Sequence, residues 1–169
     1  MTTTKITPRI YVACLASYNA GKLHGKWIDA TQCPDDIQAE VDAMLAESTE
    51  PFAEEWAIHD HEGLGDIGES ESFERVSAIG QAVDDAGDDA PALLAFLDYD
   101  SHNDPEDFED SYAGEWDSLE DFAYDFHEDT GGLSDHPLLA HVDWKSVARD
   151  MNVWTADAPN GGVYVFWNR

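Results

Sequence analysis

The sequence has very few basic residues: 8 Lys and Arg stand against 37 Asp and Glu, and the formal net charge is -29. Residues 76–144 contain no Lys or Arg at all but carry 20 Asp and Glu. A surface of one sign repels itself and opposes compaction, so proteins usually intersperse both signs. The segregation therefore predicts a surface that attracts a basic partner. Because phosphate contacts come largely from Lys and Arg, the same scarcity argues against direct nucleic-acid binding.

Cysteines and long apolar runs are also scarce. Cys14 and Cys33 form no CxxC pair, and a disulfide framework usually needs more cysteines in a shorter secreted chain, so we expect free thiols. The sequence has no apolar run of 18 residues, and its polar amino terminus lacks the apolar centre of a signal peptide. These absences predict a cytoplasmic protein that does not enter a membrane.

Large apolar residues interrupt the acidic segment throughout its length, for example at Leu93, Phe108, Trp116 and Phe126. Disordered acidic tails lack such residues because they cannot bury enough apolar surface to fold. With 43% hydrophobic and 11% aromatic residues, the whole chain can bury a core. We therefore expect the acidic segment to fold and to hold its charges in fixed positions.

Hydrophobic periodicity and turn signals predict an α+β chain with mixed sheet and helix ends and a helical middle. Strands are expected at residues 10–15, 26–30, 56–59, 153–156 and 163–167, and helices at residues 34–45, 70–83, 91–97, 104–112, 118–131, 137–141 and 144–151. Ser70 is the expected cap of the second helix. Turn residues predict hairpins at residues 18–25 and 159–162, the latter through an Asn-Gly pair.

Motifs for catalysis and cofactors are weak. A GxSxG nucleophile signature is absent, and His59 and His61 lack a third ligand nearby in the sequence. The glycines at 63, 65 and 68 are flanked by acids, which repel phosphate. The sequence thus predicts no enzyme, with no catalytic, cofactor-binding or metal-binding residue.

Two alternatives account for the acids without a basic partner. Asp98–Glu109 places acids at positions 1, 3, 7, 9 and 12 of a calcium loop, although position 5 is His102, position 6 is Asn103 rather than Gly, and Pro105 favours the start of a helix. A halophilic surface is also acidic, but its acids should be spread over the whole chain. A calcium-binding or halophilic interaction protein is therefore the competing interpretation.

Three motifs carry a family resemblance. LASYNAGKLHGKWID (residues 15–29), EWAIHDHEG (residues 55–63) and FAYDFHEDTG (residues 122–131), together with the final hairpin, resemble ArdA-type antirestriction proteins over most of the chain. The resemblance implies an elongated mimic of B-form DNA built of three small domains, here residues 1–62, 63–103 and 104–169. It also implies a homodimer, carried by mobile elements, that competes for the DNA-binding groove of type I restriction-modification enzymes at their methyltransferase core.

We hypothesise that acids between residues 98 and 129 supply most of the DNA-like charge, and that acids at 84–89 extend it. Duplex DNA carries one charge per ~1.7 Å, so the net charge of this chain corresponds to about 50 Å of duplex. The acidic set comprises Asp84, Asp85, Asp88, Asp89, Asp98, Asp100, Asp104, Glu106, Asp107, Glu109, Asp110, Glu115, Asp117, Glu120, Asp121, Asp125, Glu128 and Asp129.

Overall fold

The computed structural model describes residues 5–131 and 136–169, and within them the chain forms two three-stranded antiparallel sheets with helices. The predicted α+β class is confirmed. Contacts within the chain divide it into two compact units, Met1–Glu106 and Asp107–Arg169. The finer division at residues 62 and 103 stays a prediction. No helix in the described part of the chain is long and apolar enough to cross a membrane.

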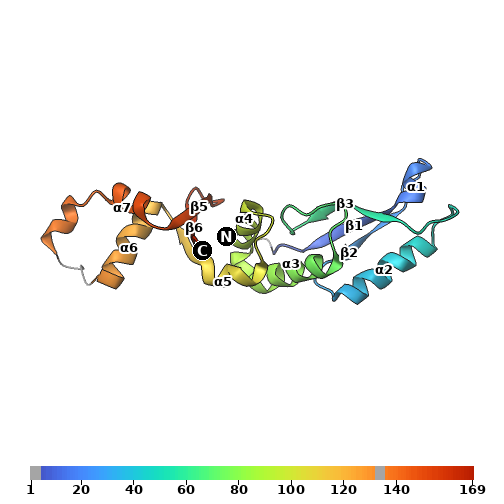
Figure 1. Cartoon of the computed structure of the whole chain (residues 1–169), viewed down its shortest axis with the longest axis horizontal. Helices are drawn as coiled ribbons and strands as arrows, with labels where there is room; N and C mark the ends of the chain where they lie inside the picture. Colours follow the sequence, from blue (N-terminus) through green and yellow to red (C-terminus); the bar gives the residue numbers. More distant parts are fainter. Residues whose placement is uncertain (1–4, 132–135) are drawn as a thin grey trace. The chain divides into compact units, whose positions relative to one another are not determined.

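The first unit contains a sheet with helices α2 and α3 on one side of it (Figure 1). Its strands are β1 (Arg9–Cys14), β2 (Gly25–Asp29) and β3 (Trp56–Glu62), with β1 in the middle. Alternate residues of β1 point to the same face of a sheet. Accordingly, Ile10, Val12 and Cys14 are completely buried, as the largely apolar run at 10–15 predicts for a strand.

The helices of the first unit start where the sequence offers suitable residues. They are α1 (Leu15–Asn19), α2 (Pro34–Ala46), α3 (Phe73–Ala86) and α4 (Ala90–Tyr99), with a short 3-10 helix η1 (Gly87–Asp89) before α4. Pro34 occupies the first turn of α2, where its fixed φ suits a helix. The cap of α3 is Ser72, whose hydroxyl accepts from the Arg75 backbone N–H at 3.2 Å. The prediction of Ser70 as the cap was wrong by two residues.

The connection between β1 and β2 is longer than the predicted turn, because α1 forms first. Its end is closed by backbone bonds from Ala20 to Ala16 and Ser17, and Gly21 then turns the chain with a φ of +77°. Glycine adopts this conformation without a Cβ clash. The hairpin prediction therefore holds for the pairing of the strands but missed one helical turn.

The second unit contains the other sheet, in the order β4-β6-β5. Its elements are α5 (Phe108–Ser111), β4 (Tyr112–Trp116), α6 (Leu119–Gly131), α7 (Trp144–Asp150), β5 (Val153–Asp157) and β6 (Val163–Trp167), with 3-10 helices η2 (Pro105–Asp107) at the junction of the units and η3 (Pro137–His141) before α7. The helix predicted to reach residue 112 was wrong there, because Tyr112 pairs with Phe166 and begins β4. The final hairpin and α6 are confirmed.

Aromatic side chains make the core of the second unit. Phe166 is completely buried and stacks on Trp154 with ring centroids 4.2 Å apart. Phe122 on α6 contacts Trp116 and Trp167 at centroid distances of 5.4 Å and 5.8 Å. Burying each such ring contributes roughly 1.5–3 kcal/mol. These contacts fix α6 on the sheet, and with it the acids that α6 carries.

Candidate acidic interaction surfaces

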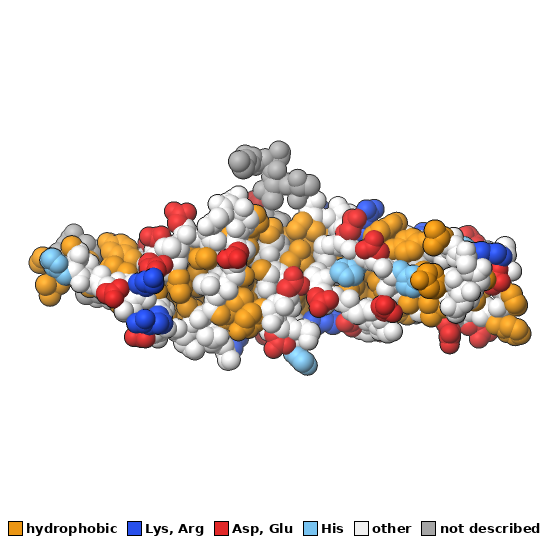
Figure 2. All heavy atoms as spheres, turned by 90° about the horizontal axis from the view of Figure 1, so that it is seen from above, with side chains coloured by type: hydrophobic (Ala, Val, Ile, Leu, Met, Phe, Trp, Pro, Cys, Tyr) orange, Lys and Arg blue, Asp and Glu red, His pale blue; other side chains and the backbone are white. Residues whose placement is uncertain are grey.

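The acidic set lies at the surface. None of its 18 members is buried, and only Glu120, Asp125 and Glu128 are half-buried, while the others are exposed. Figure 2 shows red Asp and Glu side chains standing out from the face that it presents. The two units share the set, with members up to Glu106 in the first unit and members from Asp107 in the second. Each group is therefore described by itself.

The acids at the end of α3 and in η1 have mixed structural roles. Asp84 and Asp85 lie in the last turn of α3, where the helix macrodipole makes a negative charge unfavourable by about 0.3–1 kcal/mol. Asp84 is compensated by Lys5, whose Nζ lies 2.8 Å from Asp84 Oδ1. Asp88 and Asp89 precede α4, where the macrodipole favours acids. Of these four acids, Asp85 is the one whose position in its helix is unfavourable and, among the described residues, not compensated by an ion pair.

Asp98, Asp100 and Asp104 each accept a hydrogen bond from a different backbone amide. Asp98 Oδ1 lies 2.8 Å from the Asp66 N, Asp100 Oδ1 lies 2.9 Å from the His102 N, and Asp104 Oδ1 lies 3.0 Å from the Glu106 N. The His102 backbone bond, followed by the bond from its ring, lowers the pKa of Asp100. Asp100 and Asp104 thereby stabilise their own turns, whereas Asp98 links the end of α4 to the distant loop at Asp66.

The structure does not gather the proposed calcium loop into one ligand shell. Calcium takes six to eight oxygen ligands around a single point. Among residues 5–131 and 136–169, no group of three or more His, Cys, Asp or Glu side chains is arranged to hold a metal ion. The acids of Asp98–Glu109 instead continue from α4 through η2 into α5, and Pro105 begins the 3-10 helix. The geometry favours local turn-stabilising bonds over a cation site.

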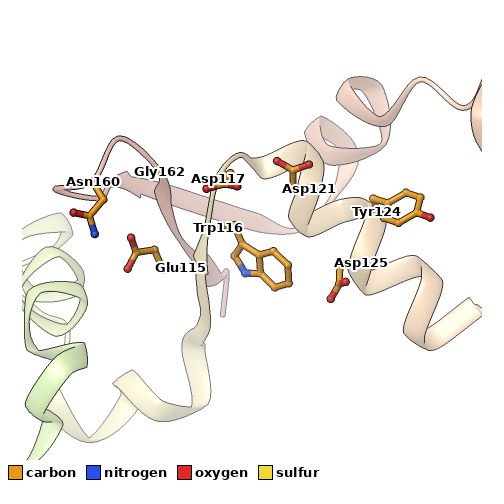
Figure 3. Close-up of a pocket in the computed structure, with 8 residues that line it drawn as sticks. All are labelled: Glu115, Trp116, Asp117, Asp121, Tyr124, Asp125, Asn160 and Gly162. Carbon is orange, nitrogen blue, oxygen red and sulfur yellow. The ribbon is translucent and has the colours of Figure 1, made fainter. Parts of the chain in front are cut away.

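In the second unit, four members of the set surround an open hollow of about 610 Å³ (Figure 3). Glu115 comes from β4, Asp117 from the turn after it, and Asp121 and Asp125 from α6. The remaining lining residues are Trp116, Tyr124, Asn160 and Gly162. The close pairing of β4 with β6 brings the turn at 158–162 to this hollow: a Cβ on Gly162 would lie 2.4 Å from the Trp116 carbonyl oxygen.

The other acids of the second unit lie at the end of η2, on α5 and along α6. Asp110 pairs with Arg169, whose Nη2 lies 3.2 Å from Asp110 Oδ2. Asp121 accepts from the hydroxyl of Ser118 at 2.6 Å, and the same hydroxyl accepts from the Asp121 backbone N–H, which confirms Ser118 as the cap of α6. Glu128 and Asp129 lie in the last turn of α6, where the macrodipole disfavours them.

Three basic side chains of the first unit pair with acids outside the set. Arg9 pairs with Glu62, Lys22 with Glu50 and Lys26 with Glu40, and none of these acids belongs to the acidic set. Within the described residues, the carboxylates of twelve members of the set accept no hydrogen bond and form no ion pair. They are Asp85, Asp88, Asp89, Glu106, Asp107, Glu109, Glu115, Asp117, Glu120, Asp125, Glu128 and Asp129.

Sequence reasoning missed two parts of these surfaces. It did not place Asn160 and Gly162 beside Glu115 and Asp117, because their meeting depends on the long-range pairing of β4 with β6. It also did not separate Asp84 and Asp110 from the unpaired acids, since their partners lie far away in the sequence. The only available signal was the scarcity of Lys and Arg, because each of the few basic residues has many acids with which to pair.

The fold and these surfaces define an acidic α+β protein that presents its carboxylates to solvent. The family model described as "Antirestriction protein (ArdA)" matches residues 10–163, nearly the whole chain. The chain therefore belongs to the ArdA antirestriction family, as the sequence motifs predicted. The family consists of inhibitors rather than known enzymes, and its activity implies an interaction with restriction enzymes. The search of curated proteins found no match to this chain.

Proposed function

We propose that this protein inhibits type I restriction-modification enzymes by mimicking B-form DNA, so that it occupies the DNA-binding groove of their methyltransferase core in competition with DNA. The observation that carries this proposal is the presence of twelve surface carboxylates that have no partner among residues 5–131 and 136–169. A DNA-binding groove presents Lys and Arg to phosphates. Carboxylates that are not already paired are available to those same groups.

The fixed positions of the acids support mimicry over a disordered acidic tail. Asp125, Glu128 and Asp129 stand on α6, which is anchored by Phe122 and Phe126 against Trp167. Acids three or four residues apart on a helix have Cβ atoms about 5–6 Å from each other. The folded helix fixes the positions of these acids before binding, so formation of the complex avoids the entropy cost of ordering them.

Some of these acids lower the stability of the folded protein, which supports a role for them in binding a partner. Asp85, Glu128 and Asp129 oppose the macrodipoles of α3 and α6, and Asp125 and Asp129 are like charges four residues apart. Each effect costs a few tenths of a kcal/mol in an isolated helix. Selection for folding alone gives no reason to keep acids at these positions.

The further properties that belong to this proposal are those that the family resemblance implies. The protein would act as a homodimer in the cytoplasm of a cell that receives foreign DNA, and it would protect DNA that enters with a mobile element. It would need no cofactor and would not bind nucleic acid itself. Its whole effect would come from occupying the groove.

Competition between this protein and a DNA duplex for a purified type I methyltransferase core tests the proposal directly. We expect the protein to displace the duplex, and we expect displacement to weaken as salt is added, because screening reduces attraction between the acids and a basic groove. Failure of the folded protein to displace the duplex at low salt would overturn the proposal.

Two matched triple variants separate the mapped acids from net charge. Asp125→Asn, Glu128→Gln and Asp129→Asn together remove three charges from α6, whereas Glu47→Gln, Glu54→Gln and Glu55→Gln remove three exposed charges outside the set. At about 0.5 kcal/mol for each exposed charge pair, the α6 variant should compete roughly tenfold more weakly and with a flatter salt dependence. The control variant should compete as the unchanged protein does. Equal weakening in both would reject this map.

A further inference from the structure

Trp116 forms part of the wall of the hollow in the second unit, between β4 and α6 (Figure 3). The strand register shifts between Tyr112 and Gly114, so Ala113 forms a bulge, and its carbonyl accepts from the Trp116 indole N–H at 3.0 Å. Bulges re-aim side chains and are common beside functional sites. Because the indole N–H is bonded within the chain, a ligand in the hollow meets the ring itself. Trp116 is half-buried, and its open part therefore offers a π surface.

Two contacts hold the Trp116 ring in this position. Gly114 has a φ of +106°, and a Cβ added to it would lie 3.2 Å from Trp116 Nε1, so a larger residue would crowd the indole. Phe122 of α6 meets the indole edge-to-face, with ring centroids 5.4 Å apart. The ring is therefore positioned before a ligand arrives, which reduces the entropy cost of binding.

Asp117 and Asp125 line the same hollow, and neither carboxylate has a partner within the described residues. Figure 3 shows Asp125 projecting from α6 on the side of β4 toward which Trp116 points, whereas Glu115 leaves β4 on the other side. Neighbouring strand residues point to opposite faces in this way. A π surface with carboxylates beside it, contributed by different elements, is the chemistry of a cation site.

The geometry of the hollow suits an organic cation better than a metal ion. Among residues 5–131 and 136–169, no three acidic, His or Cys side chains converge on a point that a metal could occupy, and the hollow measures about 610 Å³. A guanidinium is planar and weakly hydrated, so it can stack on an aromatic ring while its N–H groups bond to carboxylates. An ammonium is a compact and strongly hydrated charge, which gains less from such a ring.

The chain holds one of its own arginines with the same groups. In the first unit, Arg9 Cζ lies 4.4 Å from the centroid of the Trp27 ring, and Arg9 Nε and Nη2 donate to Glu62 at 2.7 Å and 3.0 Å. The hollow of the second unit offers a tryptophan ring and carboxylates in the same way. No basic side chain in the described part of the chain pairs with its acids. An arginine from another protein can therefore take that place.

We propose that this hollow binds the guanidinium group of an arginine of the partner protein, which stacks on Trp116 and is held by Asp117 and Asp125. The inference rests on the proposed function, since it takes the partner to be the restriction enzyme whose groove presents Arg and Lys to phosphates. It gives this one position a preference for arginine over lysine. Negative charge alone would attract both residues equally.

Titration with two small cations tests this preference without a restriction enzyme. N-acetyl-arginine amide and N-acetyl-lysine amide carry the same charge. The indole N–H signal of Trp116 in a heteronuclear NMR spectrum, assigned by its loss in Trp116→Phe, reports on their binding. We expect the arginine derivative to shift this signal at a roughly fivefold lower concentration, the factor for one cation–π contact. Equal concentrations for the two derivatives, or no movement of the Trp116 signal, would overturn the proposal.

Two matched double variants separate the hollow from the general charge of its unit. Asp117→Asn with Asp125→Asn removes two carboxylates of the site, whereas Glu109→Gln with Asp129→Asn removes two acids of the same unit that do not line the hollow. The first variant should need roughly tenfold more of the arginine derivative, and the second should bind it as the unchanged protein does. Circular dichroism confirms that both are folded. Equal weakening in the two variants would reject the site.

Failure of this inference and failure of the proposed function give different results. If the protein displaces the duplex from the methyltransferase core but shows no preference for the arginine derivative, the arginine site is rejected and DNA mimicry stands. If the derivative binds beside Trp116 with the expected preference but the folded protein displaces no duplex, the arginine site stands. The restriction enzyme is then rejected as the source of the arginine.

Discussion

Gly80 of α3 lies directly against the backbone of Ala30: a Cβ added to Gly80 would stand 2.3 Å from the Ala30 carbonyl oxygen. The same face of α3 is fixed by Ser77, whose hydroxyl donates to the Gln32 carbonyl at 2.6 Å. Two successive contacts of this kind clamp α3 onto the segment between β2 and α2. The absence of a side chain at Gly80 is what allows the helix to approach so closely.

Gly80→Ala should therefore destabilise the protein, although alanine usually favours a helix over glycine by about 0.5–1 kcal/mol. The clash is with backbone, which can relieve it only by shifting α3, at a cost of about 1–3 kcal/mol. Chemical denaturation measures the change. Gly68→Ala is the control, because a Cβ at Gly68 meets nothing within 4 Å, and it should leave stability nearly unchanged. A Gly80→Ala protein as stable as the original would contradict the packing.

Phe52 has a φ of +59°, the only positive value among the described residues other than glycine, and its side chain is 89% exposed. This conformation is unfavourable for a residue with a Cβ by roughly 1–2 kcal/mol. We expect Phe52→Gly to raise the melting temperature by relieving the strain, whereas Phe52→Ala, which keeps the Cβ, should not. Equal effects of the two changes would show that the loop stores no strain.

The pair formed by Glu40 and Lys26 predicts a pH-dependent contribution to stability. The hydrogen bond from Lys26, followed by that from Gln32, lowers the pKa of Glu40 below its ordinary value. The contribution is therefore present above the unfolded carboxyl pKa of about 4.3 and is lost as the pH falls through the lower folded value.

Thermal unfolding of Glu40→Gln between pH 3 and 7 checks this sign. At pH 7 the change should cost about 0.5–1 kcal/mol, a value reduced by the partial exposure of both side chains, and the difference should disappear toward pH 3. Glu47→Gln, at an exposed carboxylate after α2, should show no such convergence. A cost that persists unchanged in acid would indicate lost packing rather than a lost ion pair.

Lys5 and Asp84 offer a change that strengthens the proposed mimic. Lys5→Gln leaves Asp84 without its 2.8 Å partner and adds to the net negative charge. Competition with DNA should become stronger at low salt, while stability should change little, because solvent screens an exposed ion pair. Lys5→Arg keeps the pair and should behave as the original protein. Weaker competition by the folded Lys5→Gln protein would mean that Asp84 does not face the partner.

The elements predicted correctly are those whose signals are local. Pro34 and the stripe of Ile37, Val41 and Met44 define α2 in the sequence, and the structure places that stripe in the core. β4 could not be predicted in this way, because its five residues include Gly114 and follow a helix start at Pro105. Tyr112 becomes a strand residue through its pairing with Phe166. The stabilisation from this pairing cannot be predicted from the residues that neighbour Tyr112 in the sequence.

The acidic surface was predictable in composition but not in detail. The lack of Lys and Arg identifies the segment, and amphipathic spacing predicts that Asp125 and Asp129 face solvent. Whether an acid is occupied depends on contacts such as Arg169 with Asp110, which only the folded chain brings together. The functional role of the set remains a prediction, as does the division into three domains.

Arg75 is the one basic residue between Lys26 and Lys145, and its guanidinium donates to the carbonyls of Ser101 and Asn103 at 3.1 Å and 3.0 Å. Arg75 thus stabilises a turn by binding neutral carbonyl groups and does not neutralise a carboxylate. The carboxylates nearby are therefore neutralised by cations from the solvent. A basic partner that replaces those cations releases them into solution, as a protein does when it binds DNA. Binding of the mimic should then be favoured by entropy, because ions are released into solution from both surfaces.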